Sequence, residues 1–279
     1  MVVGQRQRTL TGIAIAAGIA VLLLWALAPV YWILVTALKP EREIYAFPPT
    51  FMPTAPTLQH YGKILFESVF PRFLRNSAVV AMAATLASAL ISTLAAYAIT
   101  RMRFRGRRLV ARAIVAAYLL PPSLLFIPLF IVLQHLGLID TLAGLVLAYL
   151  TFTVPFCTWL LIGYLRTIPV ELDEAARIDG ASRLQILVRI LLPLAAPGVA
   201  VVALFAFTQA WNEFLYALVF VFGNDSRTIT SGLAGLMMGD VFIWGQLMAA
   251  SVIAMLPVLA IYFAAQRYLI QGLTGGSLK

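Results

Sequence analysis

Residues 168–198 read IPVELDEAARIDGASRLQILVRILLPLAAPG, and they join two long apolar stretches at about 143–165 and 194–222. Carboxylates and arginines crowd the first half of this segment, so that half is too charged to cross a lipid bilayer. Each flanking stretch is long enough for a membrane-spanning helix, which needs about 20 mostly apolar residues. The pattern predicts two spanning helices joined by a structured loop outside the membrane.

The joining loop, about 166–195, carries the start and stop signals of two short helices. Pro169 can start the first helix, because its missing N–H would lack a partner there anyway. Gly180 is expected to end that helix after about three turns. Ser182 and Gln185 form a capping-box pattern that starts the second helix. On pattern alone, this helix–glycine–helix hairpin suits either close packing against a partner protein or an amphipathic helix lying on the membrane surface.

The composition extends this reading to the whole chain. The 279 residues are 62% hydrophobic and 11% charged, against about 45–50% and about 25% in ordinary soluble domains. A soluble globule of this size cannot bury so much apolar surface, which excludes a soluble enzyme. We expect an all-α polytopic membrane protein with one transmembrane domain over residues 1–279. Six stretches qualify as spans: about 13–38, 74–99, 110–133, 143–165, 194–222 and 244–266.

Two of these spans contain prolines that should disturb them. Pro121 and Pro122 should break or kink the third span, either as a hinge for gating or within static packing. Pro193 and Pro197 lie near the start of the fifth span. They should make that start irregular and limit the second short helix of the loop.

The basic residues set the orientation. An even number of spans places both termini on one side, and 14 of the 20 Lys and Arg residues lie on that side. The positive-inside rule therefore places both termini in the cytoplasm of a cell-membrane protein. The arginine cluster at residues 101–108 is interpreted as this topology signal, with anionic lipid headgroups as neighbours and no nucleic acid.

One polar segment lies inside the fifth span. Glu213 is the only acidic residue in any expected span, and a carboxylate there should face protein or water. Gln209, Asn212, Glu213 and Tyr216 recur at the spacing of one helical face. This face is expected to line either the substrate path, where Trp211 or Tyr216 could stack on a sugar, or the seam with another subunit.

The remaining polar positions are less informative about function. Asn76, at the outer end of the second span, fits either a helix N-cap or a lining of the outer path. His60 and His135 lie far apart in sequence and Cys157 is the only cysteine, so we expect no metal site and no intrachain disulfide. The sequence contains no G-x-x-x-x-G-K-[ST] motif. ATP hydrolysis would therefore have to come from another polypeptide.

Two motifs together resemble a known family. The pattern E-A-A-x-x-D-G-A, followed by LLPLAAPG, resembles the loop of permease subunits in ABC importers, in the form typical of the carbohydrate branch. The C-terminal Gln266–Leu269 followed by GLTGGSLK is similar to the end of the smaller, six-span permease of maltose-type transporters. The residues that match the loop motif are Glu174, Ala175, Ala176, Asp179, Gly180 and Ala181.

The resemblance implies a type I ABC importer permease with a coupling helix that seats in a cytoplasmic ATPase. The alanines would permit close seating, Glu174 would face a basic group of the ATPase, and Gly180 would allow the turn. The cytoplasmic tail, 267–279, would reach toward the ATPase dimer as an extended strand. Its candidate contact residues are Gly272, Leu273, Thr274, Gly275 and Gly276.

The implied assembly contains several other chains. A second, homologous permease would form a heterodimer with this one, and two ATPase subunits would hold ATP and Mg, so this chain carries no cofactor. A solute-binding protein would dock outside and deliver a sugar or sugar-like solute; a non-sugar solute such as a glycerol-phosphate ester is the alternative.

Two other classes are weighed against this interpretation. An ion-gradient-driven secondary transporter would need further ionisable residues in the membrane and paired internal repeats. A polytopic membrane enzyme would need His, Asp or Glu clustered at the membrane surface. The sequence displays neither feature.

Overall fold

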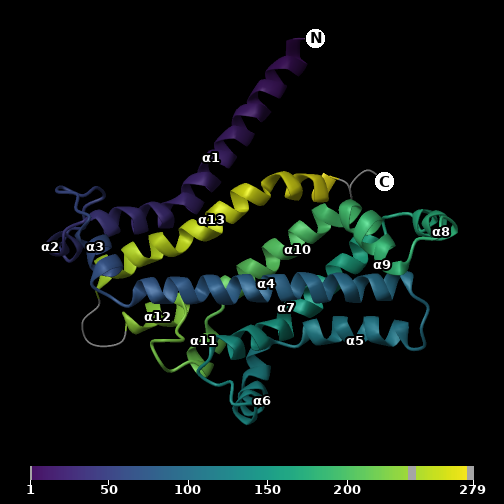
Figure 1. Cartoon of the computed structure of the whole chain (residues 1–279). Coiled ribbons are helices and arrows are strands. Elements are labelled where there is room, and N and C mark those ends of the chain that lie inside the picture. Colours follow the sequence, from purple (N-terminus) through teal and green to yellow (C-terminus); the bar gives the residue numbers. More distant parts are fainter. Residues whose placement is uncertain (1, 238–242, 275–279) are drawn as a thin grey trace. The chain divides into compact units, whose positions relative to one another are not determined.

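The structure is a computed structural model that describes residues 2–237 and 243–274, and Figure 1 traces the chain. Within these ranges every regular element is a helix, which confirms the all-α prediction. The chain separates into two compact units. One comprises Met1–Val69 and Gly235–Met255, and the other Phe70–Ala234 and Leu256–Lys279.

The first unit contains α1 (Val2–Leu38), α2 (Glu41–Ile44), α3 (Gln59–Phe66) and the first part of α13 (Trp244–Thr274). Buried polar groups hold the proline-rich segment between α2 and α3. The Glu43 carboxylate accepts hydrogen bonds from the Thr54 N–H at 3.1 Å, the Thr54 hydroxyl at 3.0 Å and the Thr50 hydroxyl. The His60 ring Nε2 lies 2.9 Å from the Lys39 carbonyl oxygen. The segment thus folds as a small cap without regular strands.

The second unit is built on three long helices: α4 (Phe70–Arg101), α7 (Leu142–Leu165) and α10 (Leu192–Asn212). These helices pack against one another, and α5 (Arg107–Leu119) lies along α7, as Figure 1 shows. Small side chains line the contacts, among them the fully buried Ala84 and Ser88 of α4. The Ser88 and Thr153 hydroxyls are hydrogen-bonded at 2.7 Å. Small residues let membrane helices approach closely, and a shared hydrogen bond satisfies their polar groups.

Five of the six expected spans have a helix long and apolar enough to cross a bilayer: Leu10–Leu38, Phe70–Arg101, Leu142–Leu165, Arg183–Asn212 and Trp244–Gln266. The third expected span, 110–133, is broken. It consists of α5 and α6 (Pro122–His135), which are bent by 102° at the break between them. Pro121 holds the preceding Leu120 in an extended conformation, and neither Pro121 nor Pro122 can donate a backbone hydrogen bond.

The fifth span begins differently from our expectation. Helix α9 (Arg183–Ile186), the π-helical turn η1 (Leu187–Leu191) and α10 run on as one helix, so Pro193 and Pro197 do not limit it. The predicted irregularity is present as the π turn, where the Leu192 N–H donates to the Leu187 carbonyl. The wider turn lies directly before Pro193, whose ring would clash with a regular helical backbone.

The end of the fifth span was predicted wrongly. Instead of continuing to residue 222, α10 stops at Asn212, and a separate short helix, α11 (Leu215–Phe220), follows. Glu213 has an extended conformation between them. Beyond it lies α12 (Ile229–Gly235). At the C-terminus, α13 runs to Thr274, so Gly272–Thr274 are helical where an extended strand was expected.

Candidate functional site

The two-turn helix α8 (Glu171–Ile178) divides its side chains between two faces. Asp173 and Ala176 point inward and are buried, with 7% and 8% of their surface exposed. Ala175 is exposed on the opposite face, as is Ile178, at 87%. The first two alanines of the motif therefore differ: Ala176 anchors the helix to the rest of the chain, whereas Ala175 is exposed on the face that could contact another protein.

The Asp-Gly-Ala part of the motif forms the turn that ends α8. The Gly180 N–H donates to the Arg177 carbonyl at 3.1 Å, and the Ala181 N–H donates to the Ala176 carbonyl at 2.9 Å. This is the Schellman arrangement, whose third-from-last helical carbonyl is reached by a residue beyond the helix. Gly180 occupies its left-handed position, with φ of 83°. The helix stop predicted at Gly180 is confirmed, though α8 has about two turns rather than three.

The second arm of the hairpin starts as the sequence predicts. Ser182 and Gln185 form a reciprocal capping box: the Gln185 side chain accepts from the Ser182 N–H at 2.8 Å, and the Ser182 hydroxyl accepts from the Gln185 N–H. The following residues, Ile186 and Leu187, are buried in the same apolar cluster as Ala176 and Leu165 of α7. The hairpin is thus packed onto the second unit through its inner face.

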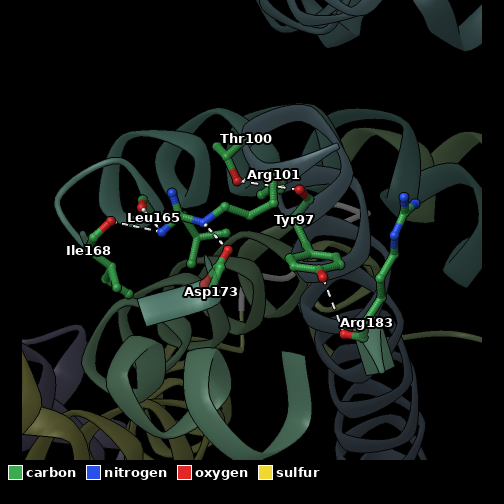
Figure 2. A network of polar contacts seen from close by, with 8 residues as sticks. Tyr97, Thr100, Arg101, Leu165, Ile168, Asp173 and Arg183 are labelled. Carbon is green, nitrogen blue, oxygen red and sulfur yellow. Dashed lines mark hydrogen bonds and ion pairs between the residues drawn. The ribbon is translucent and has the colours of Figure 1, made fainter. Parts of the chain in front are cut away.

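A polar network at the C-terminal end of α4 holds the hairpin at its inner face (Figure 2). The Arg101 Nη2 donates to the carbonyl oxygens of Leu165 and Ile168 at 3.1 and 2.8 Å. Its Nε lies 3.0 Å from an Asp173 carboxylate oxygen, and both side chains are at least nine-tenths buried. The Tyr97 hydroxyl donates to the Arg183 carbonyl at 3.2 Å. One turn of α4 therefore contacts both arms of the hairpin.

The network borders a polar cavity of about 420 Å³. Arg101, Arg177 and Arg183 line it, together with Asp173 and Glu174. Burial raises the pKa of the Asp173 carboxyl, and the neighbouring Arg101 and Arg177 oppose this shift by favouring the charged form. The resemblance predicts that Glu174 faces a basic group of the ATPase. In the structure Glu174 is exposed and lines the same cavity as these arginines of its own chain.

Sequence reasoning missed Arg101 and Ile178 as parts of this site. Arg101 belongs to a run of arginines that we interpreted only as a topology signal. Its distinguishing feature is its place at the last position of a spanning helix, next to the free carbonyls where α7 ends. Ile178 has a signal in the sequence, because it lies three residues after Ala175 and this spacing places the two apolar side chains on one helix face.

The residues expected on one face of the fifth span do not share a face. Gln209 and Asn212 are exposed, whereas Trp211 and Tyr216 are buried. Trp211 stacks on Phe207, with ring centroids 5.4 Å apart. The helix ends before the face is complete, so the helical spacing does not apply. The expectation that Trp211 or Tyr216 is open for stacking on a sugar is wrong for this conformation.

Glu213 has a structural task at the helix break. Its carboxylate accepts hydrogen bonds from the N–H groups of Tyr216 at 2.8 Å and Ala217 at 3.0 Å, at the start of α11. The Tyr216 hydroxyl donates to the Pro122 carbonyl at 2.8 Å. The Tyr216 side chain therefore links the helix break before α11 to the helix break before α6.

Asn76 is neither an N-cap nor a lining of an open path. It lies within α4 and is fully buried. Its amide donates to the carbonyl oxygens of Asp225 and Arg227 at 2.8 and 2.9 Å. Nearby, Arg72 forms an ion pair with Asp225, and the Ser77 hydroxyl accepts from the Ile229 N–H at 2.8 Å. The N-terminal end of α4 thus holds the segment that precedes α12.

Two other predictions concern the tail and metals. Of the candidate tail residues, Gly275 and Gly276 lie outside the described residues, and Gly272, Leu273 and Thr274 are the end of α13. Across the described ranges, no group of three or more His, Cys, Asp or Glu side chains is placed to hold a metal ion.

Comparison with known proteins assigns this arrangement to a family. Residues 88–275 match the family described as the binding-protein-dependent transport system inner membrane component. The chain belongs to this family. The permease is 37% identical over 275 residues to the inner membrane ABC transporter permease protein YcjP of Escherichia coli (strain K12), covering 98% of each. It is 36% identical over 279 residues to the trehalose/maltose transport system permease protein MalG of Thermococcus litoralis, covering 99% of each.

A solved structure agrees with the fold. One chain in a crystal structure of a bacterial ABC transporter involved in the import of the acidic polysaccharide alginate superposes with a TM-score of 0.82. The two are 24% identical, and the match covers 94% of this permease and 98% of that chain. The expected type I importer permease fold is confirmed. The protein is a multi-pass inner-membrane transport subunit of a binding-protein-dependent ABC importer, and it is not an enzyme.

Proposed function

We propose that this permease imports a sugar or sugar-like solute by alternating access, driven by ATP hydrolysis on partner ATPase subunits that hold the ATP and Mg. The trehalose/maltose permease of Thermococcus litoralis is 36% identical over nearly the whole chain and supports the solute class. A solute-binding protein, which the family description implies, would deliver the solute from outside.

The exposed face of α8 is the observation that carries the ATPase partnership. Ala175 and Ile178 present a small and a large apolar side chain side by side, away from the chain's own core. Asp179 and Glu174 border them with charge. An exposed apolar patch with a charged rim is typical of a protein interface. The buried Ala176 and the Schellman turn hold this patch in a fixed shape, which favours a rigid coupling helix.

A second permease is the proposed neighbour within the membrane. Gln209 and Asn212 are exposed polar residues near the end of a spanning helix. Polar side chains in the bilayer need protein or water as a partner, so they belong at the seam of a heterodimer or along the solute path. Both termini, the hairpin and the tail would lie in the cytoplasm, as the basic residues indicate.

Purification of the tagged permease with its partners tests this function. We expect an ATPase to co-purify, and its activity to rise when the solute-binding protein loaded with trehalose or maltose is added to the complex in nanodiscs. Ala175→Arg should abolish co-purification of the ATPase, because it places a long, charged side chain on the docking face. The same substitution at Ala46, an exposed alanine of the cap, should leave co-purification intact.

Two results would overturn the proposal. Equal recovery of the ATPase with wild type and Ala175→Arg would remove the hairpin from the interface. Stimulation by a binding protein loaded with an amino acid, but with neither trehalose nor maltose, would exclude a sugar as the solute.

A further inference from the structure

The guanidinium of Arg101 connects the ends of three helices. Arg101 is the last residue of α4, and it bonds the carbonyl of Leu165, the last residue of α7, and that of Ile168 in the turn beyond (Figure 2). Its remaining contact is the ion pair with Asp173 in the first turn of α8. Carbonyls at a helix end have no partner within the helix and carry partial negative charge, so a cation suits this position.

The ion pair between Arg101 and Asp173 is buried. The side chains of Arg101 and Asp173 are only 5% and 10% exposed. A buried ion pair is no guarantee of added stability, since apolar residues of similar size often serve as well. Arg101 adds a defined geometry through its Nη2, which must point at the carbonyl oxygens of Leu165 and Ile168. Its Nε pairs with Asp173 by charge, at 3.0 Å, without the alignment of a hydrogen bond. Apolar contacts such as that of Ala176 are non-directional and let surfaces slide.

The two faces of α8 then have different tasks. Ala175 and Ile178 face outward to the proposed ATPase, and Asp173 faces inward to Arg101. A displacement applied to the outer face must pass through the inner face to reach the membrane helices. Among the described contacts on the inner face of α8, the pair with Arg101 is the one ion pair. Through Arg101, this ion pair connects α8 directly to α4 and α7.

We propose that Arg101 and Asp173 form a latch that makes α8 move with α4 and α7 as one body, which gives Arg101 the role of a positioning residue for coupling. The latch rests on the proposed function, in which α8 docks on an ATPase. It predicts that ATPase binding and coupling are separable: the outer face of α8 provides binding, and the latch converts binding into transport.

Variants of the latch in the purified complex test this separation. With Arg101→Gln or Asp173→Asn we expect the ATPase to co-purify at wild-type levels and to keep its basal activity. Stimulation by the trehalose-loaded binding protein, and trehalose uptake into proteoliposomes, should fall at least tenfold. Arg101→Lys keeps the charge but not the fork of donors, so it should recover part of the stimulation. The matched control is Arg105→Gln, an exposed arginine in the same run, which should change stimulation less than twofold.

The double variant Arg101→Gln/Asp173→Asn guards against simple misfolding. It leaves no unpaired buried charge, and the Gln amide can still donate a hydrogen bond. If it assembles and its ATPase is stimulated as in wild type, the latch is overturned. If it assembles and remains unstimulated, the ion pair itself is needed for coupling.

A measurement on otherwise wild-type chains covers the case in which no latch variant assembles. Spin labels at Glu171 and Ile91, both exposed and on α8 and α4, report the distance between these helices. The latch requires this distance to stay constant within about 2 Å when ATP binds, because the two helices form one body. The native Cys157 is fully buried and should not take up label. A larger change in distance would contradict the latch.

Ala175→Arg, measured in parallel, tells the two proposals apart. If it leaves ATPase binding and stimulation unchanged, the docking of α8 on an ATPase fails, whatever the latch variants do. If it abolishes binding while Arg101→Gln keeps full stimulation, docking stands and only the latch fails.

Discussion

Gly180 determines how the helix–glycine–helix hairpin turns. Its φ of 83° lies in the left-handed region, which a β-branched residue enters only at a cost of about 1–3 kcal/mol. No atom lies within 4 Å of the position that a Cβ would take, so conformation rather than space makes glycine necessary. We expect Gly180→Val to lose substrate-stimulated ATPase activity while the permease remains in the membrane at normal levels.

Asparagine at the same position is the matched control. It tolerates the left-handed conformation better than other side chains, and the open space accommodates it. Gly180→Asn should therefore keep most of the stimulated activity. Equal loss in both variants would mean that the face of the turn itself is needed for contact, and that its backbone conformation is not the cause.

Glu43 makes the cap sensitive to acid. The hydrogen bond from Thr50 lowers the pKa of its carboxyl, against the opposing effect of burial. A carboxyl with a lowered pKa in the folded state adds stability above its unfolded pKa of about 4.3 and loses it as the pH falls through the folded value. The thermal midpoint of the wild type should therefore drop more between pH 6 and pH 3.5 than that of Glu43→Gln. Parallel curves for the two proteins would refute the assignment.

Among the elements, the break between α10 and α11 shows where pattern reasoning stops. The sequence correctly indicates an apolar span with one acidic residue, but the spacing of Gln209, Asn212 and Tyr216 has meaning only if the helix continues. Glu213 ends it by offering its carboxylate to the free N–H groups of the next helix. A periodicity cannot reveal such a competing local hydrogen bond, because the same residues fit both arrangements.

The helix–glycine–helix hairpin was more predictable, since its signals are local. Gly180, Ser182 and Gln185 determine turn and cap within a few residues, and all three act as predicted. Arg101 was not predictable, because its partners lie 64 or more residues away along the chain. The effect of the prolines on the helices was predictable only in part. Pro121 and Pro122 do break a span, whereas Pro193 is absorbed by a π turn.

Replacing Glu213 tests its capping task. Glu213→Leu removes both acceptors at the start of α11 and should destabilise the permease by about 1–2 kcal/mol, the usual cost of a lost helix cap. Glu213→Gln keeps one carbonyl oxygen and should cost less. Thermal unfolding in detergent measures both, with Gln209→Leu, an exposed position on α10, as the control expected within about 0.5 kcal/mol. If Glu213→Leu unfolds like the wild type, the carboxylate is not a structural cap.

In the whole molecule, α4 contacts a different loop of the second unit at each of its ends. Asn76, near the start of α4, holds the segment around Asp225, and Arg101 at its other end holds the hairpin. The two positions are 25 residues apart along the helix, a rise of about 38 Å. Since the hydrocarbon core is about 30 Å thick, the two loops must lie on opposite sides of the membrane.

The basic residues then decide which side is which. Of the 20 Lys and Arg residues, 14 fall on the side of the hairpin and the termini, and that side should be cytoplasmic. An impermeant maleimide added to intact cells should label Asn224→Cys and miss Leu184→Cys, both exposed positions. Leu184 suits the inner probe because its side chain is exposed and takes no part in the cap of α9, which Ser182 and Gln185 form. Both cysteines should react after the cells are opened, which controls for access. Labelling of Leu184→Cys alone in intact cells would reverse the orientation and place α8 out of reach of any cytoplasmic ATPase.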